Sequence, residues 1–256
     1  MDIIHFHRKP TNMACLYYPI RKSAKFNKEQ VQSERVDMPI VIRKATKQDV
    51  PHIVSIIKLA FDEDSSPEQI ETCIHNSNFQ TFIAEIDEII AGFNFGFVTT
   101  SIDGKKRLEL DLQAVHPDYQ GQGIGKKLIE RFTELEIESD CIRALIKVDN
   151  IRMEKALTRP GFSTDNQICG LYVSSNAAGK VIAPQGSHLI PVTTMTYNGI
   201  WLEGQVTTQA INAALGSKKQ ENDIVGAVVP ISDESAIKAL ELANFDFINH
   251  YRRWYL

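Results

Sequence analysis

The chain has 256 residues, of which 43% are hydrophobic, and 28 Lys and Arg stand against 32 Asp and Glu, for a net charge of −4. This length allows one or two domains with a sizeable core. The mild acidity disfavours nucleic acid as the main ligand, and no apolar run approaches the roughly eighteen residues of a membrane span. The N-terminus mixes basic and apolar residues, unlike a signal peptide, and the four scattered cysteines are typical of reduced thiols without metal spacing. We therefore expect a cytoplasmic protein that binds neither a membrane nor a metal.

Residues 1–37 differ in composition from the rest of the chain. They carry seven Lys and Arg against four Asp and Glu, a local net charge of +3. No regular hydrophobic period runs through them, so we expect a loosely ordered N-terminal extension. Met38 stands directly before the first periodic segment, and translation starting there is a second expectation.

The next segment predicts a strand, two helices and a hairpin. Pro39–Ala45 reads as a strand, and Thr46 is placed to cap a helix with an apolar face at Val50, Ile53, Val54, Ile57 and Phe61. A polar helix is expected near 67–76. Thr81–Ile86 and Ile89–Thr100 predict a hairpin around Asp87-Glu88. Gly92 and Gly96 in its second strand indicate bulges or a close approach of another backbone.

The middle of the chain predicts a strand, a glycine-rich loop and an amphipathic helix. Leu108–Ala114 alternates apolar and polar residues, and His116-Pro117-Asp118 is a turn signal. Three glycines come next, within residues 120–126. The helix then places Ile124, Leu128, Phe132 and Leu135 on one stripe. Bare amides at the start of a helix favour a phosphate group, because the helix dipole adds about half a positive charge there.

Three phosphate-binding patterns compete for this loop. The nucleotide P-loop needs a Ser or Thr after its Lys, but Lys127 follows Lys126. The dinucleotide pattern needs its third glycine one position after Gly125. A third pattern, Gln/Arg-x-x-Gly-x-Gly/Ala, is fitted at every defined position by Gln120, Gly123 and Gly125. On these residues the segment resembles the pyrophosphate loop of the GNAT acetyltransferases, which bind acetyl-CoA.

The resemblance extends over residues about 39–175. Strand Ile142–Val148, helix Asn150–Thr158, the Pro160-Gly161-Phe162 stop and strand Gln167–Val173 come in the order of the family. Asn150, Gly161 and Phe162 keep a recurring family pattern, whereas the usual tyrosine is replaced by Leu157. The resemblance implies an α/β GNAT fold, with a mixed central sheet flanked by helices. Residues 38–175 are the expected acetyl-CoA-binding catalytic domain.

The C-terminal third echoes the same domain. Leu240, Phe245 and Tyr255 each lie 83 residues after a matching residue of the first domain. We therefore predict that residues 190–256 form a degenerate half-GNAT repeat. Its segment 203–208 has a Glu and a Val where the glycines should stand, so we expect one CoA site only. The repeat is expected to complete the sheet, to cover the substrate cleft, or to form a homodimer surface.

In such a domain the pantetheine arm follows the central strand and the diphosphate sits on the loop. The resemblance therefore implies a cofactor site along one stretch of the chain and one residue beyond it. These residues are Gln113, Ala114, Val115, Gln120, Gly121, Gln122, Gly123, Ile124, Gly125, Lys126 and Asn150.

Acetyl transfer to an amine also needs a group that removes a proton. Glu109 lies where some relatives place a catalytic Glu, and Asp111 shares its face of the strand. Both are candidate catalytic residues, as base or as a binding group for a cationic amine; a plain polar strand face is the alternative. Leu157 cannot protonate the departing thiolate, and Tyr119 or Tyr172 are candidates for that role.

Two functions are consistent with these residues. The first is an N-acetyltransferase that moves an acetyl group from acetyl-CoA to a primary amine of a small molecule or peptide. The acidic pair and the acidic run at 62–71 favour a cationic acceptor. The second is a non-catalytic acyl-CoA-binding sensor or interaction module, which the missing tyrosine favours.

Overall fold

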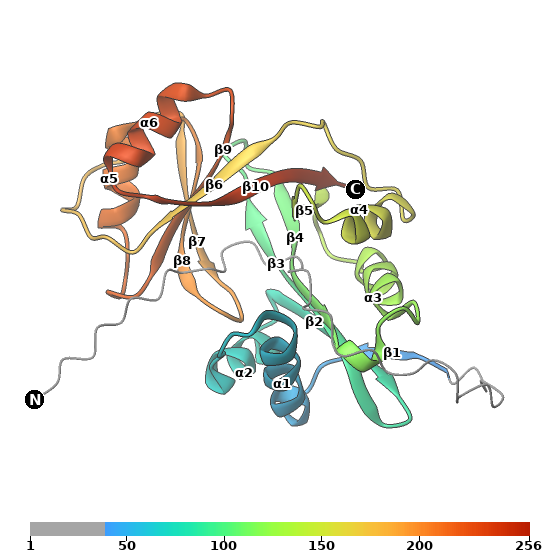
Figure 1. Cartoon of the computed structure of the whole chain (residues 1–256). Helices are drawn as coiled ribbons and strands as arrows, with labels where there is room; N and C mark the ends of the chain where they lie inside the picture. Colours follow the sequence, from blue (N-terminus) through green and yellow to red (C-terminus); the bar gives the residue numbers. More distant parts are fainter. Residues whose placement is uncertain (1–38) are drawn as a thin grey trace, which may run out of the picture. The chain divides into compact units, whose positions relative to one another are not determined.

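The computed structural model describes residues 39–256, which divide into two units (Figure 1). The expectations about residues 1–37 and a start at Met38 lie outside the described part. We call residues 39–166, 194–196 and 252–256 the N-terminal unit, and residues 167–193 and 197–251 the C-terminal unit. Each unit is described by itself.

The N-terminal unit is built on a mixed sheet, as the sequence predicts. Its strands are β1 Val41–Lys44, β2 Phe79–Ile86, β3 Ile89–Thr100, β4 Lys106–Val115, β5 Cys141–Lys147 and the end of β10 Asp246–Tyr255. Strands β1 to β4 pair antiparallel in sequence order, β4 pairs with β5 in parallel, and β10 lies next to β5. The parallel step requires the crossover helix that the loop at 120–126 opens.

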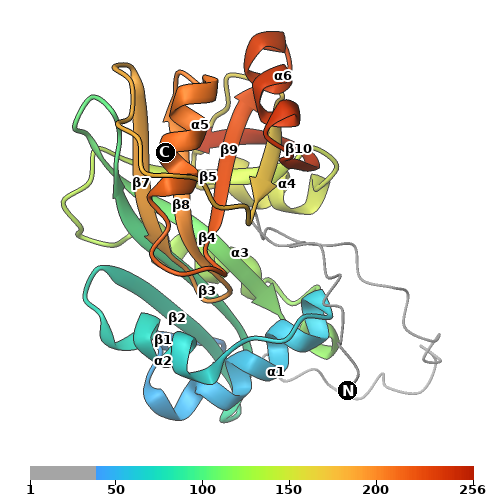
Figure 2. The same ribbon diagram turned by 90° about the vertical axis from the view of Figure 1, so that its left-hand side faces the viewer.

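Four helices cover this sheet: α1 Val50–Phe61, α2 Pro67–His75, α3 Ile124–Thr133 and α4 Ile151–Thr158. Helices α1 and α2 lie together next to β2 (Figure 2). Local chemistry fixes their starts, since Ser66 accepts a hydrogen bond from the N–H of Gln69 and Pro51 occupies the first turn of α1. No helix in the described part of the chain is long and apolar enough to cross a membrane.

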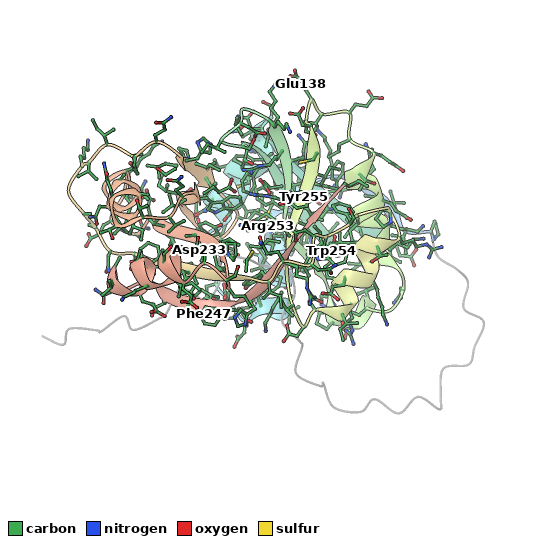
Figure 3. All side chains as sticks on the ribbon, turned by 90° about the horizontal axis from the view of Figure 1, so that it is seen from above. Glu138, Asp233, Phe247, Arg253, Trp254 and Tyr255 are labelled. Atoms are coloured by element: carbon green, nitrogen blue, oxygen red, sulfur yellow. The ribbon has the colours of Figure 1, made fainter. Side chains whose placement is uncertain are left out.

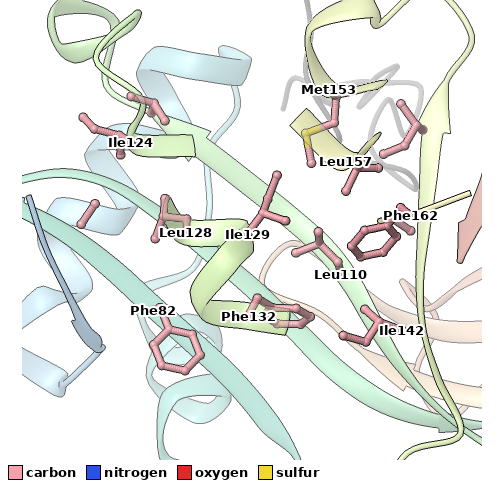
Figure 4. Close-up of a cluster of buried hydrophobic side chains, with 14 of the residues drawn as sticks. Phe82, Leu110, Ile124, Leu128, Ile129, Phe132, Ile142, Met153, Leu157 and Phe162 are labelled. Carbon is pink, nitrogen blue, oxygen red and sulfur yellow. The ribbon is translucent and has the colours of Figure 1, made fainter. Parts of the chain in front are cut away.

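Helices α3 and α4 bury their apolar stripes in one hydrophobic cluster against the sheet (Figure 4). Leu128, Phe132 and Leu157 are fully buried there. Asn94 of β3 donates a buried hydrogen bond of 2.8 Å to the carbonyl of Leu128, which fixes α3 on the strands. The predicted stripe of the helix is thus confirmed; Leu135 packs against the cluster just beyond the end of α3.

Gly96 marks a bulge between β3 and β4. The register passes from Phe95 opposite Leu112 to Gly96 opposite Leu110, so Asp111 is the extra residue on β4. A Cβ on Gly96 would lie 2.3 Å from the carbonyl oxygen of Glu109 and 2.3 Å from the ring of Phe132. The glycine is therefore required by close approach, and the bulge re-aims Asp111 out of the regular alternation.

Within the C-terminal unit the strands follow the order β10-β6-β9-β8-β7. Its remaining elements are β6 Cys169–Ser174, β7 Ser187–Thr193, β8 Asn198–Gly204, α5 Thr208–Gly216, β9 Ile224–Pro230 and α6 Glu234–Leu242. Strands β8 and β9 are parallel, and β6 is antiparallel to both neighbours. Strand β7 was not predicted, because Pro191 interrupts its pattern; Pro191 is exposed.

The turn before α5 has a capping side chain, whereas the loop before α3 has none. The side chain of Thr207 accepts a hydrogen bond from the N–H of Ala210, and Val206 is buried in the core of the unit. A side chain therefore uses one of the helix-start donors and another fills the space. This is the local structure expected of a turn without a phosphate site.

The units divide the chain differently from the expected boundaries at 175 and 190. Strand β6 belongs to the C-terminal unit, whereas residues 252–256 belong to the N-terminal unit. The backbones of Leu256 and Ile142 exchange two hydrogen bonds of 2.9 and 3.0 Å, and those of Tyr255 and Ser163 exchange two more. Arg253, Trp254 and Tyr255 succeed one another along this part of β10 (Figure 3). Strand β10 thus has paired residues in both units. The sequence-based boundaries at 175 and 190 did not anticipate this, because they assumed that each domain is a continuous segment of the chain.

Truncating Trp254 tests this assignment. Trp254 is 8% exposed and belongs to the cluster of α3 and α4, so Trp254→Ala should lower the free energy of unfolding by about 3–5 kcal/mol. Ile151→Ala, at a residue of α4 that is 59% exposed, is the control and should cost less than about 1 kcal/mol. Urea unfolding followed by fluorescence and circular dichroism measures both. A loss for Trp254→Ala no larger than the control would remove residues 252–256 from this core.

Candidate functional site

The loop between β4 and α3 presents backbone N–H groups that the described part of the protein does not use. Within that part, no acceptor pairs with the N–H groups of residues 121–126. The neighbouring N–H groups are bonded: that of Gln120 to the carbonyl of Pro117 at 3.4 Å, and that of Lys127 to the carbonyl of Gly123 at 3.1 Å. Helix α3 begins here without a side-chain cap. Unused donors and a helix N-terminus together form a site for an anion.

The glycines of this loop are needed for different reasons. Gly121 and Gly123 have φ angles of +80° and +82°, in the left-handed region, and a Cβ at either would meet open space. A side chain there would cost about 1–2 kcal/mol in backbone strain. Gly125 is different, since its Cβ would lie 3.0 Å from Nε2 of Gln113. Backbone conformation and close packing, rather than flexibility, explain the spacing of the motif.

A pocket of about 500 Å³ lies beside the loop. Eight of the predicted cofactor residues line it: Gln113, Val115, Gln120, Gly121, Gly123, Ile124, Gly125 and Lys126. Ala114, Gln122 and Asn150 do not. A pocket of this volume is within the range of sites for cofactors and other small ligands.

Four residues that line the pocket were not among the predicted cofactor-binding residues: Tyr119, which was considered only as a proton donor, and Arg152, Met153 and Ala156. Three of them come from α4, whose existence was predicted but whose orientation toward the loop was not. Asn150 could have indicated the orientation of α4 from the sequence. Its side chain caps α4 by accepting a hydrogen bond of 3.2 Å from the N–H of Met153, which fixes where the helix starts and therefore which residues share a face.

The cationic groups of the pocket sit on its helical walls. Arg152 is exposed on the first turn of α4, and Lys126 lies on the first turn of α3, where its ammonium group is 3.2 Å from the carboxylate of Glu130. Both side chains add positive charge close to the unused N–H groups. The arrangement favours a ligand that carries more than one negative charge.

Strands β4 and β5 separate next to this pocket. Their parallel pairing ends at Leu110 and Ala144, although β4 continues to Val115 and β5 to Lys147. On its other side β4 stays paired with β3 as far as Val115. The edge of residues 111–115 that faces β5 is therefore not paired with it. An extended ligand can add to such an edge through main-chain hydrogen bonds.

Two glutamine side chains hold the loop against the strand. Nε2 of Gln113 donates to the carbonyl of Gly125 at 3.3 Å, and Nε2 of Gln120 donates to the carbonyl of Val115 at 3.2 Å. Gln113 is 3% exposed, and its Oε1 is buried without a donor to pair with in the described residues. Gln120, the first residue of the predicted Gln/Arg-x-x-Gly-x-Gly/Ala pattern, thus acts by positioning the loop.

The two predicted catalytic carboxylates have different surroundings. Glu109 is 4% exposed and accepts hydrogen bonds from Thr99 at 2.5 Å and from Arg143 at 2.8 Å. Asp111 is half-buried at the bulge, and no hydrogen bond or ion pair to its carboxylate is found in the described part of the chain. Burial, together with the charge of Glu109, raises the pKa of Asp111 to about 7. A carboxylate with that pKa is poised to exchange a proton near neutral pH.

Asp111 lies on the side of the sheet that α2 covers. Burial and the charge of Asp111 raise the pKa of the Cys73 thiol, on α2, to about 12. The thiol therefore stays neutral at physiological pH. Cys73 is fully buried, so it acts as a small apolar neighbour of the carboxylate.

The position of the missing tyrosine is closed. Leu157 is 0% exposed in the cluster of α3 and α4. Tyr119 lines the pocket and packs edge-on against His116, with ring centroids 5.7 Å apart. Tyr172 lies in the core of the C-terminal unit. Of the two tyrosines considered as substitutes, Tyr119 is the one that belongs to the same unit as the loop and lines its pocket.

Comparisons with known proteins agree with this fold. Residues 48–162 match the model of the Acetyltransferase (GNAT) family. A Pyrococcus horikoshii protein assigned as an acetyltransferase is 14% identical, with 90% of this chain and 93% of that chain covered, at a TM-score of 0.57. A glucosamine N-acetyltransferase region of a fungal multi-domain β-N-acetylglucosaminidase is 13% identical, with 89% of this chain and 39% of that chain covered, at a TM-score of 0.58. No curated protein matches the sequence. At such identities the structural likeness concerns the fold.

The raised pKa of Asp111 predicts a stabilising substitution. Above pH 7 the folded protein holds a charged, partly desolvated carboxylate, whereas the unfolded chain ionises near pH 4 at no such cost. The stability contributed by the protonated carboxyl is complete below about pH 4 and is lost as the pH rises through 7. Asp111→Asn should therefore raise the free energy of unfolding at pH 8 by on the order of 1–3 kcal/mol, a range that allows for solvent screening.

Urea denaturation of both proteins at pH 8 and pH 4 measures this difference. At pH 4 the gain should shrink toward zero, since the wild-type carboxyl is then protonated in the folded state. A destabilised Asp111→Asn protein at pH 8 would contradict the assignment.

Proposed function

Residues 48–162 belong to the GNAT acetyltransferase family, and we propose that this chain moves an acetyl group from acetyl-CoA to a primary amine. The observation that carries the proposal is the loop of residues 121–126, whose N–H groups have no acceptor in the described part of the chain and border a pocket. A diphosphate provides acceptors for such donors.

Acetyl-CoA would extend from this loop along the separated strand. The N–H groups of residues 121–126, with Lys126 and Arg152, would hold the diphosphate, and the free edge of residues 113–115 would hold the pantetheine arm. Gln113 and Gln120 keep these two segments in register through their hydrogen bonds to the opposite segment. Asn150 contributes by fixing the start of α4, which is a wall of the pocket.

We assign the proton acceptor to Asp111. The amine arrives as an ammonium ion and must lose a proton before its nitrogen attacks the thioester carbonyl. The carboxylate of Asp111 takes that proton, the C–N bond forms, and the C–S bond breaks to release the CoA thiolate. The nitrogen gives up its second proton to water, which leaves the neutral amide. A base whose pKa lies near the working pH combines ionisation with proton affinity. Glu109 is less suited to take a proton from an ammonium ion, because cationic groups already face both of its oxygens.

A cationic acceptor is the substrate class that the charges support. Asp111 and Glu109 lie on one strand, and α2 presents the exposed Glu68 beside a shallow hollow that is also lined by Glu71, which is half-buried and paired with Lys47. The acidic run is partly neutralised, since Lys58 pairs with Asp62 and Asp64. These surroundings would attract an amine with an additional positive charge. A homodimer formed through the C-terminal unit stays a prediction.

One observation favours the non-catalytic alternative. The buried Leu157 leaves no hydroxyl at the position from which relatives protonate the thiolate. A thiol has a pKa near 8.5 and can leave without an acid, so this absence alone does not exclude turnover. Thiol release from acetyl-CoA in the presence of amines separates the two functions.

Asp111→Asn should lower the turnover number by 10²–10⁴ and leave acetyl-CoA affinity within about twofold, because the substitution removes the proton acceptor and keeps the loop. The turnover number is measured as the rate of CoA thiol release, detected with an aromatic disulfide that yields a coloured thiolate. The acceptors are spermidine and a panel of monoamines. Calorimetry with acetyl-CoA gives the affinity. Unchanged turnover in Asp111→Asn would refute the assignment. Binding without thiol release from any amine in the wild type would favour the sensor.

Gly123→Glu tests the loop against a matched control. The carboxylate would lie among the N–H groups and repel a diphosphate, so acetyl-CoA affinity should fall at least about a hundredfold. Gly104→Glu has the same consequences for the backbone, because Gly104 also has a left-handed φ of +83° and open space at its Cβ, but it lies in the β3–β4 turn away from the motif. Both variants should lose similar stability in urea. Equal affinity for acetyl-CoA in the two would discredit the site.

A further inference from the structure

Glu109 joins three neighbouring strands of the N-terminal unit. Its Oε1 accepts from Thr99 Oγ1 on β3 at 2.5 Å, and its Oε2 accepts from Arg143 Nε on β5 at 2.8 Å. Arg107 on β4 itself places Nε 3.4 Å from Oε1. All four side chains are at least nine-tenths buried. A buried carboxylate needs such compensation, because an unpaired charge in this environment is costly.

The position of this cluster along the strands is specific. Glu109 is directly opposite Arg143 in the parallel ladder, and Leu110 opposite Ala144 is the last pair before β4 and β5 separate. The next residue, Asp111, is the extra residue of the bulge. The cluster therefore closes the end of the opening at which the thioester is expected. Any change in the pairing of Glu109 would alter where the strands part.

Both oxygens of Glu109 face cations or a hydroxyl donor. A proton taken from an ammonium ion would have to displace one of these hydrogen bonds and would remove the negative charge that Glu109 presents to Arg107 and Arg143. Asp111 has no such partners among the described residues. The two carboxylates, which lie two residues apart on β4, are thus suited to different roles.

We propose that Glu109 is a positioning residue that holds the separating strands β3, β4 and β5 in place around Asp111, and is not the proton acceptor itself. This inference rests on the function proposed above for the same site. It assigns Thr99, Arg107 and Arg143 to the same structural unit. These three residues do not line the pocket, so their effect on the reaction passes through Glu109 and the strand.

The cluster also controls the charge next to Asp111. In the described residues, the titratable groups that act on Asp111 are Glu109 on its own strand and the neutral thiol of Cys73 on α2. Loss of the charge of Glu109 should lower the pKa of Asp111, since two nearby carboxylates oppose each other's ionisation. Loss of the positive charge of Arg143 should raise it, because the charge of Glu109 is then less compensated.

The test monitors the carboxyl group of Asp111 directly. In protein labelled with ¹³C at aspartate carboxyl carbons, Asp111→Asn identifies the signal, and its titration is recorded in the wild type, in Glu109→Gln and in Arg143→Gln. We expect the Asp111 midpoint to move down by at least about half a pH unit in Glu109→Gln and up in Arg143→Gln. A midpoint that stays in place in both variants, or moves the same way in both, overturns the inference.

Turnover separates positioning from proton transfer. At pH 9, above the midpoint, Glu109→Gln should keep its turnover number within about tenfold of the wild type, whereas Asp111→Asn should not. If Glu109→Gln fails to fold, Glu109→Gln/Arg143→Gln removes the charge and its counter-charge together and takes its place. Loss of turnover in a folded Glu109 variant, with Asp111→Asn active, would make Glu109 the base and overturn the inference. If the Asp111 midpoint moves down in Glu109→Gln and up in Arg143→Gln, but no amine causes thiol release in the wild type, the proposed acetyl transfer is wrong. The electrostatic coupling of Glu109 to Asp111 would then still hold.

Discussion

Backbone N–H groups that the described protein leaves without acceptors are the feature on which the site depends. They exist because α3 starts at a left-handed Gly123 instead of a capping side chain. The C-terminal unit shows the contrast within the same chain: before α5, Thr207 supplies the cap and Val206 fills the space. Two helices that each come after a strand and lead to a parallel strand thus differ in one respect, which is whether a side chain caps the first turn.

Other contacts of the N-terminal unit fix that turn and the strand to which the reaction is assigned in the proposal. Gln113 and Gln120 bind the loop to the strand, the Glu109 cluster sets the point where β4 and β5 part, and the bulge at Gly96 places Asp111 beside the gap. These features depend on buried polar groups or, at Gly96, on a close approach of two strands. Buried polar groups lower the stability of the fold unless they are fully hydrogen-bonded. Asp111 is the exception: the described residues offer its carboxylate no hydrogen-bond partner, and burial together with the charge of Glu109 raises its pKa to about 7.

The sequence predicted the strand, the loop and the helix around this site. The glycine spacing identified the loop, and the alternation of 108–114 identified the strand beneath it, because both are consequences of short-range geometry. It could not show that Arg143 lies opposite Glu109, since a parallel partner is chosen by the whole sheet. The sequence also proposed both Glu109 and Asp111 as catalytic residues. In the structure they differ, because Glu109 is buried and ion-paired whereas Asp111 is half-buried without such a partner among the described residues. The exchange of β6 and residues 252–256 between the units was hidden for the same reason: a strand's own pattern does not say which sheet it joins.

The central claim is that the main chain of the loop is itself the ligand-binding group, and the most direct measurement is an amide NMR spectrum of the folded chain with and without acetyl-CoA. The account predicts that the N–H signals of residues 121–126 move most on addition of the ligand and that their exchange with solvent slows. Signals of residues 205–208, before α5, should stay in place. Binding of acetyl-CoA that leaves the signals of residues 121–126 unchanged would contradict the account.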